Sequence, residues 1–167
     1  MKQKKVFLLS GPPGCGKSTW VRNHMLPSDE WISRDNVRFS IVREDEEYFS
    51  HEDDVFDTFI NYINQTLEDP KVENVYIDAT HINPRSRRKT LSSARLKNIS
   101  ELNCVYFKIP FETCLKRNAE RTGRAFVPES AIKNMYDAYI YPTKQEKFTH
   151  IYEVDEYGLE MEVETDG

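Results

Sequence analysis

The sequence has few cysteines and no long hydrophobic run. Its three cysteines show no metal-ligand spacing, and their odd number is typical of reduced thiols rather than of a disulfide framework. No apolar run approaches the ~20 residues that a membrane-spanning helix needs. The apolar run behind the basic residues 1–5 is shorter than the core of about 7–15 residues in a signal peptide. We therefore expect a cytoplasmic protein with no membrane partner.

The sequence also lacks internal repeats, low-complexity tracts and linkers. Its 167 residues are enough for a sizeable core, so we expect a single domain over residues 1–167. The net charge of -5 argues against a nucleic-acid partner, but the acidic residues are unevenly spread. Residues 151–167 are strongly acidic and hold no Lys or Arg. The rest of the chain is slightly basic, so the field at a local site can be positive and can attract a polyanion.

Short apolar runs alternate with helical patterns along the chain. This alternation predicts an α/β fold, a parallel sheet of about five strands with helices on both faces. We expect the strands at 6–9, 31–33, 75–78, 104–109 and 148–154, and the helices at 18–25, 34–42, 55–67, 84–98, 111–121 and 128–139. The last strand leads into an acidic strand or hairpin over about 148–167. Ligands of such sheets bind at the carboxyl ends of the strands.

One glycine-rich stretch follows the first expected strand and precedes the first helix. It fits the phosphate-cradling P-loop pattern G-x-x-x-x-G-K-[ST] and consists of Gly11, Pro12, Pro13, Gly14, Cys15, Gly16, Lys17 and Ser18, with Thr19 next in the chain. Glycines let backbone N–H groups close around an anion. Lys17 would reach the β- and γ-phosphates of ATP, and the Ser18 hydroxyl would ligate Mg²⁺.

Two acidic residues follow other strand ends and would face the same crevice. Asp35 suits a general base that accepts a hydroxyl proton, although a helix N-cap would look the same in the sequence. Arg38 lies one turn further along that helix, where it would hold a substrate phosphate or simply be solvated. Asp78 ends its strand as the acids that hold Mg²⁺ do in P-loop enzymes, directly or through water.

Further polar residues are candidates for the acceptor and for a lid. Thr80 and His81 follow Asp78 and would orient the acceptor, although a lone histidine more often packs or caps. Three arginines would share a helix face in a lid over about 117–127, or form a basic exposed helix end: Arg117, Arg121 and Arg124. A basic cluster forms the expected wall for a polyanion, or else a solvated helix face: Arg85, Arg87, Arg88, Lys89, Arg95 and Lys97.

Four blocks of this sequence, in the same order and at similar spacing, resemble the 5′-polynucleotide kinases of bacteriophage type. The first block is the P-loop with its Thr19-Trp20 extension, and the second is the segment 32–38 around Asp35. The third block, 80–84, reads Thr-His-Ile-Asn-Pro and is followed by arginines. The fourth block covers 115–118, Arg121, 127–128 and 135–136. The family's acid beside the threonine falls at Ala79 here, and the nearest acid is Asp78.

The resemblance implies an ATP-dependent kinase of the 5′-hydroxyl ends of DNA or RNA with a P-loop kinase-like fold. Asp35 would then be the base, Arg38 would contact the acceptor's 3′-phosphate, and Arg121 would be the lid arginine on the transferred phosphate. Lys17 and Ser18 would serve ATP and Mg²⁺, and a phage-encoded protein would act in the host cytoplasm. Many members carry a 3′-phosphatase domain, but Glu153 stands where its nucleophilic Asp would be, so we expect a kinase domain only.

Two other functions stay open from the sequence. A kinase of a nucleoside, sugar or antibiotic would share the sheet, the P-loop and the lid. A non-catalytic nucleotide-binding module would share the P-loop but would need neither a base nor a lid arginine. The sequence also leaves open whether the protein forms a homo-oligomer.

Overall fold

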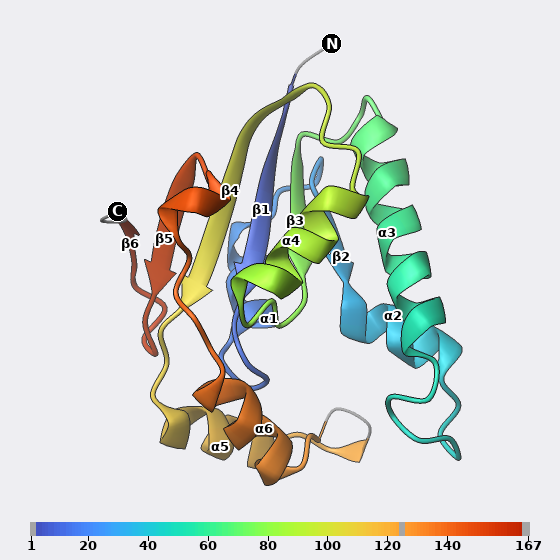
Figure 1. Ribbon diagram of the computed structural model, residues 1–167, viewed down its shortest axis with the longest axis vertical. Coiled ribbons are helices and arrows are strands. Elements are labelled where there is room, and N and C mark those ends of the chain that lie inside the picture. The colour runs from blue at the N-terminus through green and yellow to red at the C-terminus, as the bar shows by residue number, and fades with distance from the viewer. Residues whose placement is uncertain (1–2, 124–125, 165–167) are drawn as a thin grey trace.

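The computed structural model describes residues 3–123 and 126–164, which form an α/β fold around one six-stranded sheet (Figure 1). The strands are β1 (Lys4–Ser10), β2 (Glu30–Ser33), β3 (Asn74–Asp78), β4 (Ile99–Phe107), β5 (His150–Val154) and β6 (Glu160–Val163). The helices are α1 (Lys17–His24), α2 (Arg34–Ile41), α3 (Glu52–Glu68), α4 (Pro84–Ser93), α5 (Phe111–Ala119), α6 (Glu129–Asp137) and the 3₁₀ turn η2 (Lys144–Glu146).

The strand order is β2-β3-β1-β4-β5-β6. The pairs from β2 to β5 are all parallel, and only β6 runs antiparallel, against β5. Asp78 is in register with Leu9 of β1 and with Ser33 of β2. The carboxyl ends of these three strands therefore meet at one edge of the sheet, where open α/β sheets bind their ligands.

Helices cover both faces of the sheet, because the central strands are apolar on both sides. Val6 and Leu8 of β1 pack into one core cluster with Phe59 of α3, whereas Leu9 packs into a second cluster with Val21 of α1. Alternate residues of a strand point to opposite faces, which explains the division. In Figure 1, α3 and α4 lie on one side of the sheet and α1 lies behind it.

The predicted α/β architecture, with helices on both faces, is confirmed, and the predicted hairpin adds the sixth strand. Some boundaries of helices and strands differ from the predicted ones, because contacts with neighbouring elements determine them. The fourth strand begins at Ile99 rather than near residue 104, because its first residues pair with β1 from Lys4 onward. The fourth helix ends at Ser93 and not near residue 98, so the chain can reach that pairing. No helix in residues 3–123 or 126–164 is long and apolar enough to cross a bilayer.

Candidate functional site

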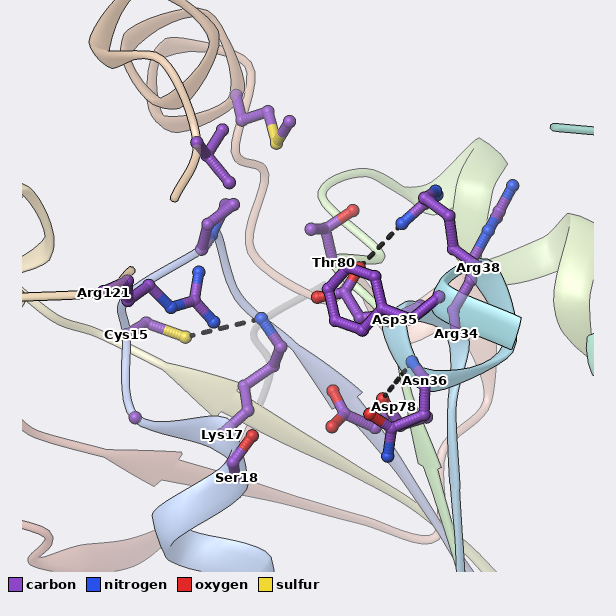
Figure 2. A pocket seen from close by; sticks show the side chains of 18 of the residues that line it. Cys15, Lys17, Ser18, Arg34, Asp35, Asn36, Arg38, Asp78, Thr80 and Arg121 are labelled. Carbon is purple, nitrogen blue, oxygen red and sulfur yellow. Dashed lines mark hydrogen bonds and ion pairs between the residues drawn. The ribbon is translucent and has the colours of Figure 1, made fainter. Parts of the chain in front are cut away.

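A cleft of about 740 Å³ opens at the carboxyl edge of β1, β2 and β3. It joins segments that are far apart in the sequence (Figure 2). Most of the predicted site residues line it: Pro13, Gly14, Cys15, Gly16, Lys17, Ser18, Thr19, Asp35, Arg38, Asp78, Thr80, Arg117 and Arg121.

The loop of residues 11–16 takes a shape that depends on glycine. Gly14 and Gly16 have φ values of 81° and 96°, which side-chain-bearing residues rarely adopt. A Cβ on Gly14 would also lie 2.6 Å from the backbone oxygen of Cys114. The loop then leads straight into α1, so the N-terminal N–H groups of that helix meet the cleft and can bind an anion.

Lys17 lies across the mouth of this loop. Its Nζ donates to the carbonyl oxygens of Gly11, at 2.6 Å, and Pro12, at 3.3 Å. In Figure 2 the Lys17 ammonium and the Arg121 guanidinium point toward each other. The two cations and the helix N-terminus converge on one position, which suits a polyphosphate.

Asp78 lies at the end of β3, almost fully buried beside Lys17. Burial raises the pKa of its carboxyl above the ordinary value, against the opposing effect of the Lys17 charge. The indole Nε1 of Trp31 donates to its Oδ2 at 3.0 Å. Within the described residues, no group of three or more His, Cys, Asp or Glu side chains could hold a metal ion alone. Asp78 and Ser18 line the same cleft. One carboxylate and one hydroxyl fit Mg²⁺, which keeps several waters and takes its other ligands from phosphates.

Asp35 faces the same cleft from the first turn of α2. The Ser33 hydroxyl caps this helix by accepting from the Asn36 N–H at 3.3 Å. Arg38 Nη1 and the Tyr48 hydroxyl donate to Asp35 Oδ1 at 2.7 and 3.0 Å. No donor from residues 3–123 or 126–164 bonds to the second oxygen, and the side chain is 51% exposed. Asp35 is thus held by one oxygen and presents the other to the cleft.

Arg38 is the centre of a side-chain network on this side. Its Nε and Nη2 donate to the two carboxylate oxygens of Glu52 at 2.8 and 3.0 Å, and only 7% of its side chain is exposed. Arg34 donates to the same carboxylate at 3.1 Å. Burial alone would raise the pKa of Glu52, but the bonds from Arg38 and the charge of Arg34 hold it below its ordinary value. Burial, and then the charge of Asp35, raises the pKa of Tyr48 to about 12, so its phenol remains a donor.

His81, Arg85 and Arg88 do not line the described part of the cleft. His81 is buried; its Nδ1 bonds to the Leu9 oxygen at 2.7 Å and its Nε2 to Thr90 Oγ1 at 2.9 Å. Because a carbonyl only accepts, Nδ1 carries the proton and Nε2 accepts from the threonine. Burial lowers the pKa of His81 to about 3, which keeps the ring neutral.

The basic cluster on α4 divides between the interior and the surface. Arg85 and Arg88 are exposed there. Arg87 instead is fully buried and pairs with Glu146 at 2.6 Å. It also donates to the backbone oxygen of His81. This arginine of the basic cluster therefore packs inside the fold, because the carboxylate of η2 compensates its charge.

Two arginines of the predicted lid lie within the described residues, and they differ in their contacts. Arg117 donates to the Cys15 oxygen at 3.2 Å and to the Glu156 oxygen at 2.7 Å, so it ties the P-loop to the turn after β5. Arg121 lies beyond the end of α5, with its guanidinium directed into the cleft. Arg124 lies outside the described residues.

Sequence reasoning missed Trp31, Tyr48, Phe49 and Glu52 as cleft residues. Residues 44–54 are polar and acidic, a composition typical of a surface connection. The structure folds this connection against Asp35 and Arg38, and Glu52 begins α3. The adjacent aromatic residues Tyr48 and Phe49 within this acidic stretch were the available signal.

Comparisons with known proteins place this geometry in a family. The family model described as AAA domain matches residues 6–142. A chain of "the Pnkp1/Rnl/Hen1 RNA repair complex" has a TM-score of 0.68 at 23% identity, over 100% of this chain and 50% of that one. This chain thus spans half the length of that protein. A fungal RNA kinase has a TM-score of 0.64 at 18% identity, over 92% and 75% of the two chains. A gluconokinase from Sinorhizobium meliloti 1021 has a TM-score of 0.58 at 19% identity, over 93% and 84%.

At such identities the solved structures show a shared fold, that of P-loop kinases, and not a shared substrate. The family model covers far more than half of the sequence and includes the P-loop, Asp35, Asp78 and the lid arginines. The chain belongs to the AAA domain family.

Proposed function

We propose that the protein is a 5′-hydroxyl polynucleotide kinase, which transfers the γ-phosphate of ATP to the 5′-OH end of DNA or RNA. The observation that carries the proposal is the position of Asp35. Its carboxylate is anchored through Oδ1, has Oδ2 open, and faces the same cleft as the P-loop. A nucleotide-binding module would need no such base, whereas transfer to a hydroxyl does.

On the donor side, the loop 11–16 and the start of α1 would hold the phosphates of ATP. Lys17 and Arg121 would neutralise the charge that spreads over the γ-phosphoryl group as it moves. Ser18 and Asp78, directly or through water, would hold Mg²⁺. When bound, this ion would offset the negative charge of the phosphates.

On the acceptor side, Asp35 would take the proton of the 5′-hydroxyl while the hydroxyl oxygen attacks the γ-phosphorus. The new O–P bond forms while the bond between the γ-phosphorus and the bridging oxygen breaks, so ADP leaves in line and no covalent enzyme intermediate arises. Thr80, on the cleft wall, would orient the acceptor. Arg38 Nη2 keeps one N–H beyond its bond to Glu52, and we assign it to the 3′-phosphate of the terminal nucleotide.

Two features support a nucleic-acid acceptor over a small one. Two of the structures with this fold are an RNA kinase and a chain of an RNA repair complex. The exposed Arg85 and Arg88 on α4 follow β3 and Thr80 in the chain, and we assign them to the phosphates of a strand that leaves the cleft.

The test is transfer of label from γ-labelled ATP to 5′-hydroxyl oligonucleotides of DNA and RNA in the presence of Mg²⁺. Wild type should label at least one of them, and Asp35→Asn should lower kcat by about 10²–10⁴-fold while ATP still binds. Asp54→Asn, an exposed acid in the first turn of α3, is the matched control and should transfer normally.

The same assay separates the competing functions. Label transferred to nucleosides or sugars, with oligonucleotides unlabelled, would make the protein a small-molecule kinase. ATP binding without transfer to any acceptor would make it a nucleotide-binding module. An Asp35→Asn variant with full turnover would remove Asp35 as the base.

A further inference from the structure

An aromatic pair lies next to the candidate base. Tyr48 and Phe49 line the cleft from the segment 42–51 between α2 and α3. Their ring centroids are 4.7 Å apart and the rings are nearly perpendicular, at 84°. Tyr48 is held by its bond to Asp35, whereas the Phe49 residue is 49% exposed. A large apolar ring thus stands open at the cleft.

The segment that carries Phe49 is held in place by its own contacts. Glu46 accepts from the backbone and the side chain of Arg43, at 3.0 and 3.2 Å, and pairs with His51 Nε2 at 2.5 Å. The Ser50 N–H donates to the Glu47 oxygen at 3.1 Å. These bonds fix the turn on both sides of Phe49, so its ring is presented to the cleft at little further cost in conformational entropy.

Arg38 lies against both rings. Its guanidinium carbon is 4.6 Å from the Tyr48 ring centroid and 5.4 Å from that of Phe49. The cation polarises these rings and supports them as a wall. The charge on this side is balanced, because Arg34 and Arg38 are paired with Glu52 and Asp35. A ligand is therefore selected here by its flat apolar surface more than by its charge.

We infer that Phe49 is the stacking platform for the nucleobase of the terminal acceptor nucleoside, the one whose 5′-hydroxyl reacts. The inference rests on the proposed function and specifies its acceptor subsite. Arg38 donates to Asp35 and its guanidinium carbon lies 5.4 Å from the centroid of the Phe49 ring, so a base stacked on Phe49 can place its own sugar hydroxyl near that carboxylate. Stacking a base on an aromatic side chain is worth about 1–3 kcal/mol and tolerates any sequence. A sugar or polyol has no such flat π-face to stack.

The experiment compares two acceptors that differ only at the 5′ end. One is a short 5′-hydroxyl oligonucleotide, and the other is the same strand with an abasic 5′-terminal residue. Wild type should prefer the base-bearing acceptor by about 5–150-fold in kcat/KM, the range that this stacking energy gives. Phe49→Leu should lose most of that preference by slowing only the base-bearing acceptor, and Phe49→Trp should keep it.

Tyr62→Leu is the matched control, because Tyr62 is 50% exposed on α3 and is not among the described residues that line the cleft. It should keep both the rate and the preference of wild type. Thermal unfolding of each variant shows that the fold is intact.

Three outcomes would overturn the platform while the kinase function stands. They are equal use of both acceptors by wild type, an equal loss on both acceptors in Phe49→Leu, and a raised KM for ATP alone in that variant. If wild type labels neither acceptor, the proposed function itself fails and the platform fails with it.

Discussion

The two halves of the cleft are built in different ways. The half that we assign to the donor is built around the consecutive residues 11–18, where glycines and the start of α1 expose backbone N–H groups. The acceptor half consists of side chains from α2, the segment 42–51 and α3, joined by hydrogen bonds between Asp35, Arg38 and Glu52. The phosphate-binding loop forms from consecutive residues, whereas the acceptor half forms only when segments far apart in the sequence pack together.

The halves also differ in charge. Lys17, Arg117 and Arg121 surround the donor position with Asp78 as the opposing carboxylate, so the field favours a polyanion. Arg34 and Arg38 are balanced by Asp35 and Glu52 on the acceptor side. Under the proposed function, charge would attract ATP to the donor half, whereas shape and hydrogen bonding would select the acceptor in the other half.

Arg121→Ala is expected to have the largest effect. It removes a cation that points into the cleft toward Lys17 (Figure 2), where the proposed function places the transferring phosphate. Loss of an arginine with this role costs about 10³–10⁵-fold in kcat. Steady-state kinetics with a saturating acceptor measures this loss, and the KM for the acceptor should change little. Arg95→Ala, an exposed arginine paired with Glu68, is the control and should behave as wild type. A variant that lost acceptor affinity instead would place Arg121 in the other half.

Glu52→Gln breaks the acceptor half alone. It weakens the bonds that Arg34 and Arg38 make to Glu52, while Arg38 keeps its pair with Asp35. Hydrogen bonds to charged groups are worth about 1.5–3 kcal/mol. The KM for the oligonucleotide should rise about 10–100-fold with the KM for ATP unchanged. Glu68→Gln, which removes the exposed pair with Arg95, should cost less than about 1 kcal/mol in unfolding free energy. An equal rise in both KM values would show that the halves are not independent.

This division also decides what could be predicted from the sequence. The P-loop and its flanking strand and helix are contiguous in the sequence, so the motif alone was enough to predict the residues of the phosphate-binding loop. Asp35 and Asp78 were predicted as cleft residues because parallel strands end at one edge, a rule of topology that needs no side-chain contact. Both are found there.

The remainder depends on contacts between distant segments. Glu52 and Arg38 are fourteen residues apart and meet only because the segment 42–51 folds back. In the sequence, Arg87 looks like one more surface arginine. In the fold it is buried because it pairs with Glu146 on η2. His81 follows the strand end as a catalytic residue would, yet its φ of 42° turns it inward onto Leu9. No pattern within a few residues of these positions carries that information.

His81→Asn tests a contact that holds the start of the donor half. The Nδ1 of His81 bonds to the backbone oxygen of Leu9, near the end of β1 and just before the P-loop. Burial lowers the folded pKa to about 3, against an ordinary value of 6.5, so below pH 6.5 the unfolded chain binds a proton that the fold excludes. The titration of His81 alone should therefore lower the stability of the fold by about 1.4 kcal/mol per pH unit as the pH drops below about 6.

The His81→Asn variant should be less stable at pH 7. The slope of its unfolding free energy against pH should be smaller than that of wild type by the amount that one proton contributes. Asparagine tolerates the positive φ at this position. Urea unfolding at pH 7, 6 and 5 measures both slopes. Equal slopes in the two proteins would mean that His81 is protonated in the fold.

Trp31→Phe has the smallest expected effect and tests a contact that joins the two halves of the cleft. Trp31 lies on β2, the strand that leads into α2 of the acceptor half. Its Nε1 donates to Asp78 on the donor side. Phenylalanine keeps a ring for the Arg22 guanidinium, 5.6 Å from the Trp31 centroid, and removes only the donor. Groups that orient a metal-binding carboxylate typically contribute about 10-fold or more to metal affinity. The Mg²⁺ concentration for half-maximal activity should rise by about that factor, with ATP binding in the absence of Mg²⁺ unchanged.

Trp20→Phe is the matched control, because the buried Nε1 of Trp20 has no hydrogen-bond partner within the described residues. Its Mg²⁺ dependence should equal that of wild type. It also leaves Trp31 as the only tryptophan, so the indole fluorescence in this background reports Mg²⁺·ATP binding directly and does not depend on turnover. If Trp31→Phe and Trp20→Phe respond alike to Mg²⁺, the indole bond does not orient Asp78, and the two halves of the cleft act without this link.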